Sequence, residues 1–281
     1  MSSYKSFAIV GAGAVGLPII GALAAQNVRV ILLSRPESTS KVVPSGVQVA
    51  KVDYSNASAV AEVFKQHNVD VVLSTITTMA VTAQRSLVDA AKLGSIKLFV
   101  PSEFGMPTEG HKEGILGEKD RFAESLKAAG IPYVRFYTGM FAENLARLIG
   151  YSTHGKITIV GKGEVPLSIT SIGDIAGFVA HVLTTLSPSE LENHVFRLEG
   201  DRKSLNELGL LFKTTVEHVD QIAGERGGVQ THIMKLIDTG AASTGWDQVN
   251  KAEGLGTNAA GSANAFWQGH QWKTLKDVHN L

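Results

Sequence analysis

Short apolar runs rich in Val, Ile and Leu alternate with longer amphipathic stretches as far as about residue 140. The apolar runs show no regular alternation with polar residues, so strands formed by them would be buried on both faces, as in a parallel sheet covered by helices. Repeated strand–helix alternation is typical of right-handed crossovers in a doubly wound α/β fold. The pattern predicts strands over 7–10, 28–33, 47–50, 70–74, 97–100 and 132–137, and helices over 15–26, 57–67, 80–93 and 112–129.

The pattern changes after residue 150. Two strands are expected over 156–160 and 165–169, around a turn at Gly161–Gly163, followed by a helix over 172–186 and a strand over 194–198. Residues 223–266 are rich in Gly, Ala, Ser and Thr and show weak periodicity. We therefore predict a larger domain over 1–150 and a smaller mixed α/β lobe over 151–281, with some segments returning to the first domain and loops that close a ligand cleft.

Charge and composition narrow the class of protein. Lys and Arg number 26 and so do Asp and Glu, which argues against nucleic acid as a partner, because nucleic-acid binders carry a basic excess. The absence of cysteine excludes disulfide scaffolds, thiolate metal sites and cysteine nucleophiles. We expect a cytoplasmic monomer or homodimer that binds a small-molecule substrate.

An uncharged stretch over 7–26 is long enough to be read as a membrane span or, with the Lys before it, as a signal peptide. Four glycines and Pro18 interrupt this stretch, which favours a strand, a turn and a helix instead. We therefore expect no membrane as a partner.

A glycine-rich turn joins the first predicted strand to the first predicted helix. Gly11, Gly13 and Gly16 form Gly-x-Gly-x-x-Gly, with Ala14 and Val15 inside it. In this context the first glycine permits a tight turn, the second lets the backbone approach a pyrophosphate, and the third lets the helix sit close to the strand. The motif predicts a Rossmann-like domain that binds a dinucleotide over 1–150, with residues 151–281 as the substrate-binding lobe.

The end of the second strand sets the type of dinucleotide. An acidic residue there would bind the ribose 2′-hydroxyl of NAD, but this chain has Ser34 and Arg35, with Lys41 shortly after. Because a guanidinium pairs with a 2′-phosphate, we predict NADP(H). The alternative is that Arg35 and Lys41 are solvated surface charges. Asp53, after the third strand, either flanks the adenine or belongs to an ordinary turn.

Familiar catalytic patterns are missing: the chain contains neither Tyr-x-x-x-Lys nor Gly-x-Ser-x-Gly, and its histidines lack metal-ligand spacing. The remaining candidates follow strand ends, where open α/β sheets bind ligands. They are Thr75, Ile76 and Thr77, then Pro101, Ser102, Glu103 and Phe104, then Tyr137, Thr138, Gly139 and Phe141. Lys119 lies on the helix between the last two groups. It can contact a nicotinamide ribose and relay a proton, or it is an ordinary exposed lysine.

Over about residues 5–210 the chain resembles the isoflavone-reductase-like and NmrA-like branch of the atypical short-chain dehydrogenases/reductases. The resemblance rests on the glycine loop with Arg35 and Lys41, on Pro101–Gly105, on Lys119 eleven residues before Gly130, and on Gly173–Ala176. It implies NADP(H), a catalytic Lys119, 2′-phosphate contacts from Arg35 and Lys41, and a nicotinamide-side wall made by Ser102, Phe104 and the 138–141 loop. It further implies hydride transfer to an aromatic or enone-type secondary metabolite, with lysine-assisted proton transfer.

Three functions stay open at this stage. The first is the NADPH-dependent reductase just described, and the second is a non-catalytic regulator of the NmrA type that senses NADP(H). The third is a redox-neutral isomerase or cyclase on the same fold, because a fold does not fix a function. Residues 211–281 match the family poorly, and Trp246, Trp267 and Trp272 within them either line an aromatic pocket or anchor a small core.

Overall fold

The computed structural model describes residues 4–39, 41–77 and 84–281. The chain folds into two compact units. The first unit comprises Met1–Glu103, Gly110–Phe136 and Ile175–Phe196, and the second comprises Phe104–Glu109, Tyr137–Asp174 and Arg197–Leu281. The return of 175–196 to the first unit is of the kind expected from the sequence, whereas the boundary differs from residue 150, because the second unit already begins within the loop after the fifth strand.

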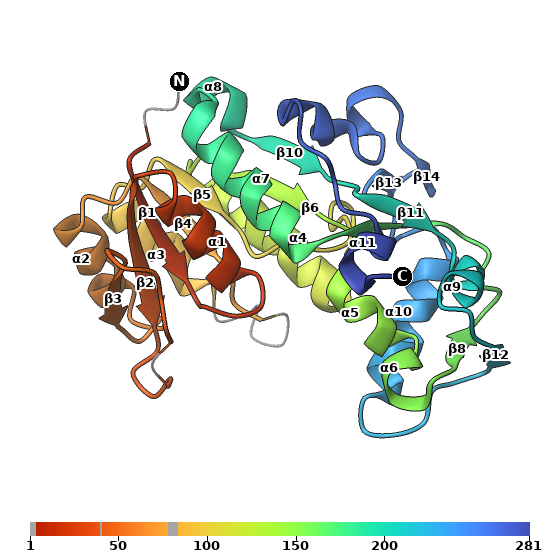
Figure 1. Ribbon diagram of the computed structural model, residues 1–281. Helices are drawn as coiled ribbons and strands as arrows, with labels where there is room; N and C mark the ends of the chain where they lie inside the picture. Colours follow the sequence, from red (N-terminus) through yellow and green to blue (C-terminus); the bar gives the residue numbers. More distant parts are fainter. Residues whose placement is uncertain (1–3, 40, 78–83) are drawn as a thin grey trace. The chain divides into compact units, whose positions relative to one another are not determined.

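A five-stranded sheet forms the centre of the first unit (Figure 1). Its strands are β1 (Ser6–Val10), β2 (Arg29–Ser34), β3 (Gln48–Lys51), β4 (Val71–Ser74) and β5 (Leu98–Val100). They run in the order β3-β2-β1-β4-β5, and each pair of neighbouring strands is parallel. The predicted doubly wound parallel sheet is confirmed, because the order reverses between β1 and β4.

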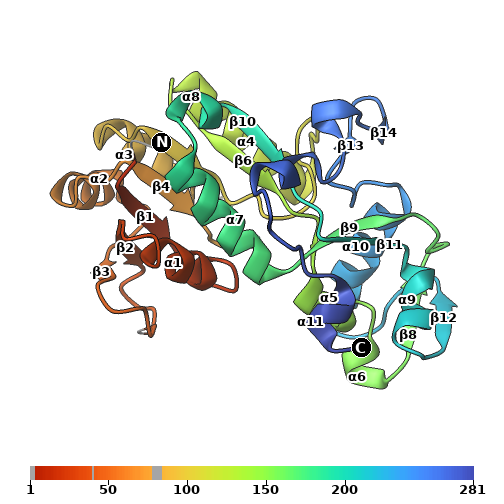
Figure 2. The same cartoon turned by 45° about the horizontal axis from the view of Figure 1, so that its top comes forward.

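Helices cover both faces of this sheet. Figures 1 and 2 show α1 (Gly16–Ala24) and the later helix α7 (Ile172–Thr185) on the face turned toward the viewer. On the other face, α2 (Ala57–Gln66), α3 (Ser86–Leu93) and α4 (Gly114–Ala128) pack on the strands. Apolar residues at alternate positions of β1, Ala8 and Val10, join the core under these three helices. The predicted helix over 80–93 is observed from Ser86, and residues 80–83 lie outside the described residues.

The sheet continues through a weaker connection to β6 (Val134–Tyr137), which pairs with β10 (His194–Arg197). An isolated parallel bridge joins Phe99 to Tyr133, just before β6. Phe136, Phe178 and Phe196 then pack their rings together, with Phe136 and Phe196 stacked at 5.3 Å between centroids. This aromatic cluster explains why 175–196 returns to the first unit, since aromatic burial contributes strongly to packing. The short helix α8 (Pro188–Leu191) lies in the same segment.

The second unit is built from short strands and helices. Its strands are β7 (Met140–Phe141), β8 (Ile157–Val160), β9 (Leu167–Thr170), β11 (Asp201–Lys203), β12 (Val216–Val219), β13 (Trp246–Asp247) and β14 (Ala252–Glu253). The two predicted strands around Gly161–Gly163 exist, but they join different sheets: β8 pairs with β12, whereas β9 lies between β11 and β7. The turn therefore does not close a hairpin.

Helices of the second unit surround one apolar core, which includes Leu145, Ile159, Leu208 and Met234. They are α5 (Ala142–Leu148), α6 (Tyr151–His154), α9 (Leu205–Leu211), α10 (Gly227–Asp238) and α11 (Leu275–His279), with 3-10 turns η2 (Gly256–Asn258) and η3 (Ser262–Phe266). The helix α10 lies in the stretch for which the sequence showed only weak periodicity.

Asp174 anchors the end of the chain within the second unit. Its buried carboxylate accepts hydrogen bonds from the backbone N–H of Lys273 at 2.9 Å and lies 2.8 Å from Nε2 of His270. The His270 ring stacks on Trp267 at 3.6 Å between centroids, and Trp272 packs edge-on against both rings. Trp267 and Trp272 therefore belong to the half-buried aromatic cluster that packs around His270 in the C-terminal segment.

Across the described ranges, no helix is both long and apolar enough to span a bilayer.

Candidate cofactor and active site

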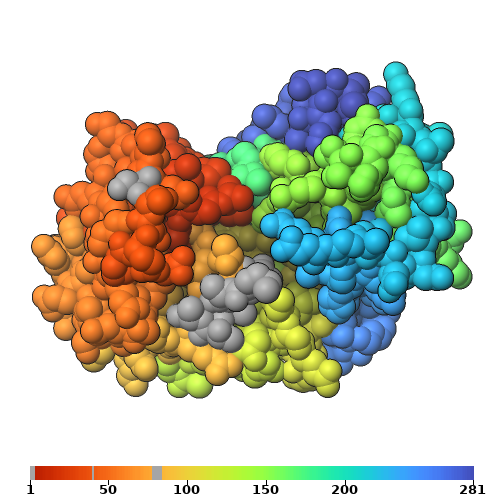
Figure 3. Space-filling view, turned by 90° about the horizontal axis from the view of Figure 1, so that it is seen from below, coloured from red at the N-terminus to blue at the C-terminus, as the bar shows by residue number. Residues whose placement is uncertain are grey.

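The loops that follow the strands of the first unit leave from one edge of its sheet. In Figure 1 the loops after β2 and β4 leave at the lower side of this unit, and Figure 3 views that side with the early part of the chain in red and orange. The register places Val10 beside Leu33 on one side and beside Ser74 on the other. The glycine loop therefore begins at the topological switch point, where open α/β sheets bind their ligands.

The glycine loop is shaped by close approaches at two of its three glycines. Gly11 has φ +94°, a conformation that favours glycine, and its N–H donates to the carbonyl of Leu33 at 3.1 Å. A Cβ added at Gly16 would lie 2.6 Å from the Gly11 carbonyl oxygen and closer still to the Thr75 hydroxyl. At Gly13 an added Cβ would meet nothing within 4 Å. Gly11 and Gly16 thus serve the fold, and Gly13 leaves space open above the loop.

Thr75 ties the glycine loop to the end of β4. Its N–H donates to the carbonyl of Val10 at 2.9 Å, and its hydroxyl donates to the carbonyl of Gly11 at 2.8 Å. Ile76 is half-buried and Thr77 is exposed at the same edge. Of these three predicted residues, Thr75 therefore holds the glycine loop in place, and Ile76 and Thr77 follow it at the same edge of the sheet.

Basic groups gather at the end of β2. Arg35 is exposed and its Nε lies 3.2 Å from Glu37, an ion pair that water weakens. Lys51 lies next to Ser34 in the register of β2 and β3, and its Nζ donates to the carbonyl of Ser38 at 2.5 Å and of Arg35 at 3.4 Å. Lys41 is exposed in the loop that follows. The structure thus adds Lys51 to the two predicted basic residues.

Two residues of the turn after β3 have defined partners. The hydroxyl of Tyr54 donates to the carbonyl of Leu33 at 2.8 Å and supports the end of β2, while burial raises the pKa of Tyr54 to about 12. The carboxylate of Asp53 accepts hydrogen bonds from the N–H and the hydroxyl of Ser55, which lower the pKa of Asp53. Asp53 thus caps its own turn, at an exposed position beside the same edge.

The loop after β5 is buried from Pro101 to Phe104. The hydroxyl of Ser102 donates to the carbonyl of Ile76 at 2.8 Å, and its N–H donates to Oε1 of Gln84 at 3.4 Å. These bonds fix the loop to the segment that follows β4. Phe104 has φ +35°, an uncommon value for a residue with a side chain, which indicates local strain at the end of this loop.

Lys119 lies in α4 with its side chain turned into the first unit. It is 8% exposed, and its Nζ donates to the carbonyl oxygen of Glu103 at 2.6 Å. Burial lowers the pKa of Lys119, Arg135 lowers it further, and Glu103 acts in the opposite direction. The structure thus overturns the reading of Lys119 as an exposed helix lysine.

A buried ion cluster lies beside Lys119. The carboxylate of Glu103 accepts from Nε of Arg135 at 2.8 Å, and both side chains are almost fully buried. Arg135 also reaches Asp120 at 3.3 Å, and Asp120 in turn accepts from the N–H of Gly110 at 3.2 Å. The sequence analysis missed Arg135 and Asp120. The available signal was an arginine in the middle of an apolar strand, since a buried charge needs a partner.

Replacing Lys119 with methionine is expected to change how stability depends on pH. Since the pKa of Lys119 is lowered in the folded protein, the unfolded chain holds the proton more tightly. The wild type therefore pays a stability cost that is fully present below the lowered pKa and fades as pH rises toward the pKa of an unfolded lysine. The melting temperature of Lys119→Met relative to wild type should fall by a few degrees between about pH 7 and about pH 10. Thermal unfolding at both pH values measures this, and an unchanged difference would contradict it.

The second unit holds the remaining predicted residues. Tyr137 and Thr138 are buried, and the N–H groups of Thr138 and Gly139 both donate to the carbonyl of Gly105, at 2.9 and 3.1 Å. Gly139 has φ +64°, and a Cβ there would overlap the carbonyl of Ser168. Phe141 is half-buried just before α5. The structure thus brings the 137–141 loop and Gly105 together within the second unit.

The residues of the first unit fit a phosphorylated dinucleotide. Val15, the N-cap residue of α1, makes no side-chain cap, and the N–H of Leu17 donates to the carbonyl of Gly13, so α1 offers a phosphate chiefly the positive end of its dipole. The space above Gly13 allows close backbone approach, and Arg35 supplies a charge at the end of β2. In the residues that the structure describes, no three His, Asp or Glu side chains are placed to hold a metal ion.

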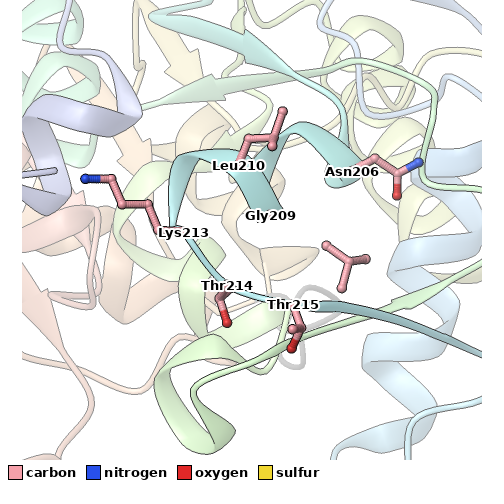
Figure 4. A pocket seen from close by; sticks show the side chains of 7 residues that line it. Asn206, Gly209, Leu210, Lys213, Thr214 and Thr215 are labelled. Atoms are coloured by element: carbon pink, nitrogen blue, oxygen red, sulfur yellow. The ribbon is translucent and has the colours of Figure 1, made fainter.

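The second unit also contains a surface pocket lined by other residues. It lies in the second unit between the end of α9 and the start of β12 (Figure 4). Its lining residues are Asn206, Gly209, Leu210, Lys213, Thr214, Thr215 and Val216. None of these is a predicted site residue, and Leu210 at its rim is 84% exposed.

Comparison with known proteins extends these findings. The profile of the NmrA-like family matches residues 4–241. The oxidoreductase aprR of Aspergillus flavus is 32% identical over 81% of this chain and 81% of its own length. The isoflavone reductase of Glycine max is 27% identical over 68% of this chain, and the match spans 64% of that reductase.

A solved structure agrees in fold along nearly the whole chain. The binary complex of leucoanthocyanidin reductase with NADPH from Vitis vinifera superposes with a TM-score of 0.75 over 98% of both chains, at 20% identity. At this identity the likeness concerns the fold. It extends over residues 211–281, where the sequence showed little resemblance.

Proposed function

The chain belongs to the NmrA-like family, as the resemblance predicted, and from this premise we propose that it is an NADPH-dependent reductase of a small aromatic or enone-type metabolite. The observation that carries the proposal is the buried amine of Lys119, held by the Glu103 carbonyl in the unit that also carries the glycine loop. Among the residues that the structure describes, Lys119 bonds a backbone carbonyl and no carboxylate, and a buried charge held in this way is poorly explained as a structural residue because it lowers stability.

NADPH, when bound, would supply a hydride to the substrate. The first turn of α1 would bind the pyrophosphate, and the basic residues at the end of β2 would bind the 2′-phosphate. Reduction of an enone or ketone also needs a proton, and the ammonium of Lys119 is the donor that we propose. Its lowered pKa favours this role, because a general acid works best when its pKa lies near the working pH.

The relatives support the class of reaction. One is named an oxidoreductase and another an isoflavone reductase. To test the proposal, purified protein is mixed with NADPH and a panel of aromatic enones and ketones. The expected result is NADPH oxidation together with a product heavier by two hydrogens. Product of unchanged mass would favour an isomerase, and NADP(H) binding without turnover across the panel would favour a regulator.

Arg35 is expected to set the preference for the phosphorylated cofactor. Arg35→Gln should weaken NADPH binding about tenfold or more, because a hydrogen bond between charged groups contributes about 1.5–3 kcal/mol. NADH binding should change little, since that dinucleotide lacks the 2′-phosphate. Calorimetric titration with both dinucleotides measures the effect. Arg29→Gln, an exposed arginine at the opposite end of β2, is the matched control, and equal losses in both variants would exclude a specific role for Arg35.

A further inference from the structure

Glu103 contacts the Lys119 side chain through its backbone rather than through its carboxylate. Within the described part of the chain, the hydrogen bond of Lys119 Nζ is to the carbonyl oxygen of Glu103, at 2.6 Å. The carboxylate of the same residue is bound by Nε of Arg135 at 2.8 Å. Glu103 thus binds Lys119 through its neutral backbone carbonyl and Arg135 through its charged carboxylate.

Without Arg135, this carboxylate would be a buried charge lacking its arginine partner. The side chains of Glu103 and Arg135 are 1% and 3% exposed, so water could not replace the lost ion pair. The ammonium of Lys119, which already bonds the backbone of the same residue, is a cation that this carboxylate acts on. A direct ion pair would hold the proton on Lys119 and turn its amine toward Glu103.

We propose that Arg135 is a positioning residue that binds the Glu103 carboxylate and so keeps the Lys119 amine on a neutral carbonyl, free to give up its proton. This inference rests on the proposed role of Lys119. Asp120 completes the arrangement, because it contacts Arg135 at 3.3 Å and, being the next residue along α4, links the arginine to the helix that carries Lys119.

The sequence context of Arg135 supports a specific role. It occupies a buried position in β6, between the fully buried Val134 and Phe136. An apolar residue would pack there without the cost of burying a charge, and replacement of buried ion pairs by apolar residues is often neutral or stabilising. Stability alone therefore gives a weak reason for the cluster, whereas control of the neighbouring amine gives a direct one.

Two charged groups that face Lys119 within the first unit shift its pKa in opposite directions, so removing one or the other should have opposite effects. Arg135 lowers the pKa of Lys119 and Glu103 raises it. Arg135→Met should therefore raise this pKa by about one to three pH units. Glu103→Gln should lower it, since Arg135 then acts unopposed except by Asp120. The double variant should return close to the wild type, because both charges are removed.

The pKa is measured on the protein without cofactor, by NMR of ¹³C-labelled lysine, with the Lys119 signal assigned by its loss in Lys119→Arg. Shifts of opposite sign in the two single variants, with restoration in the double, are expected. A signal that titrates at the same pH in Glu103→Gln as in wild type would overturn the proposal, even if Arg135→Met fails to fold. Shifts of the same sign in both single variants would also overturn it, since they would indicate general disruption.

The pH dependence of turnover provides a second measurement. With a lysine acid, kcat falls as pH rises through the pKa of Lys119, so this limb should move to higher pH in Arg135→Met and to lower pH in Glu103→Gln. The two proposals can fail separately. The expected NMR shifts in a protein that reduces no substrate would support the role of Arg135 and reject the reductase. Turnover with unmoved NMR shifts would do the reverse.

Discussion

Lys119→Met should lower kcat for NADPH-dependent reduction by about 10²–10⁴-fold, the range that a positioned proton donor contributes. Methionine preserves much of the length and the burial of the side chain but carries no proton. The binding of NADPH should largely survive, because the glycine loop and Arg35 lie on other segments of the first unit. Steady-state kinetics with calorimetric titration of NADPH separates the two effects.

Lys127→Met is the matched control for this variant. Lys127 is an exposed lysine in the last turn of the same helix, so its loss tests whether removing a positive charge from α4 is itself harmful. The control should keep wild-type kcat. If Lys119→Met bound NADPH and turned over as fast as the control, the proton would come from another group or from water.

The second large effect is expected from substitutions in the glycine loop, where two variants distinguish an effect on cofactor binding from an effect on folding. Gly13→Val should leave the melting temperature nearly unchanged, because a Cβ at Gly13 meets nothing within 4 Å. The same side chain would block backbone approach to the pyrophosphate and prevent its hydrogen bonds with the loop. Lost charged hydrogen bonds and steric overlap together should weaken NADPH binding about 10²–10³-fold.

Gly16→Ala provides the contrasting variant. Its Cβ would lie 2.6 Å from the carbonyl oxygen of Gly11, so the helix or the loop must shift. A loss of about 1–3 kcal/mol in the free energy of unfolding is expected, as for overpacked cores. Thermal unfolding and NADPH titration of both variants measure the separation. Tight NADPH binding by a folded Gly13→Val would exclude the glycine loop as the pyrophosphate site.

The site could be predicted in part because its components follow strand ends. The glycine loop, Arg35 and the 75–77 and 101–104 segments each come directly after an apolar run, and parallel strands bring their carboxyl ends to one edge. Lys51 escaped notice because its position beside Ser34 depends on the register of two strands separated by a long loop. Helix α10 escaped notice because its sequence is rich in small and polar residues and its apolar face is narrow.

By itself the sequence determined the parallel sheet, the glycine turn and the presence of an arginine where NAD-binding domains carry an acid. These features are local, because each depends on the spacing of residues within one strand–turn–helix segment. Only the tertiary structure decided that Lys119 is buried and bonded to Glu103, and that Arg135 binds the nearby carboxylate. Those facts depend on which segments meet in space. Desolvation and ion pairing act through such contacts between residues distant in the chain, and a spacing pattern does not record them.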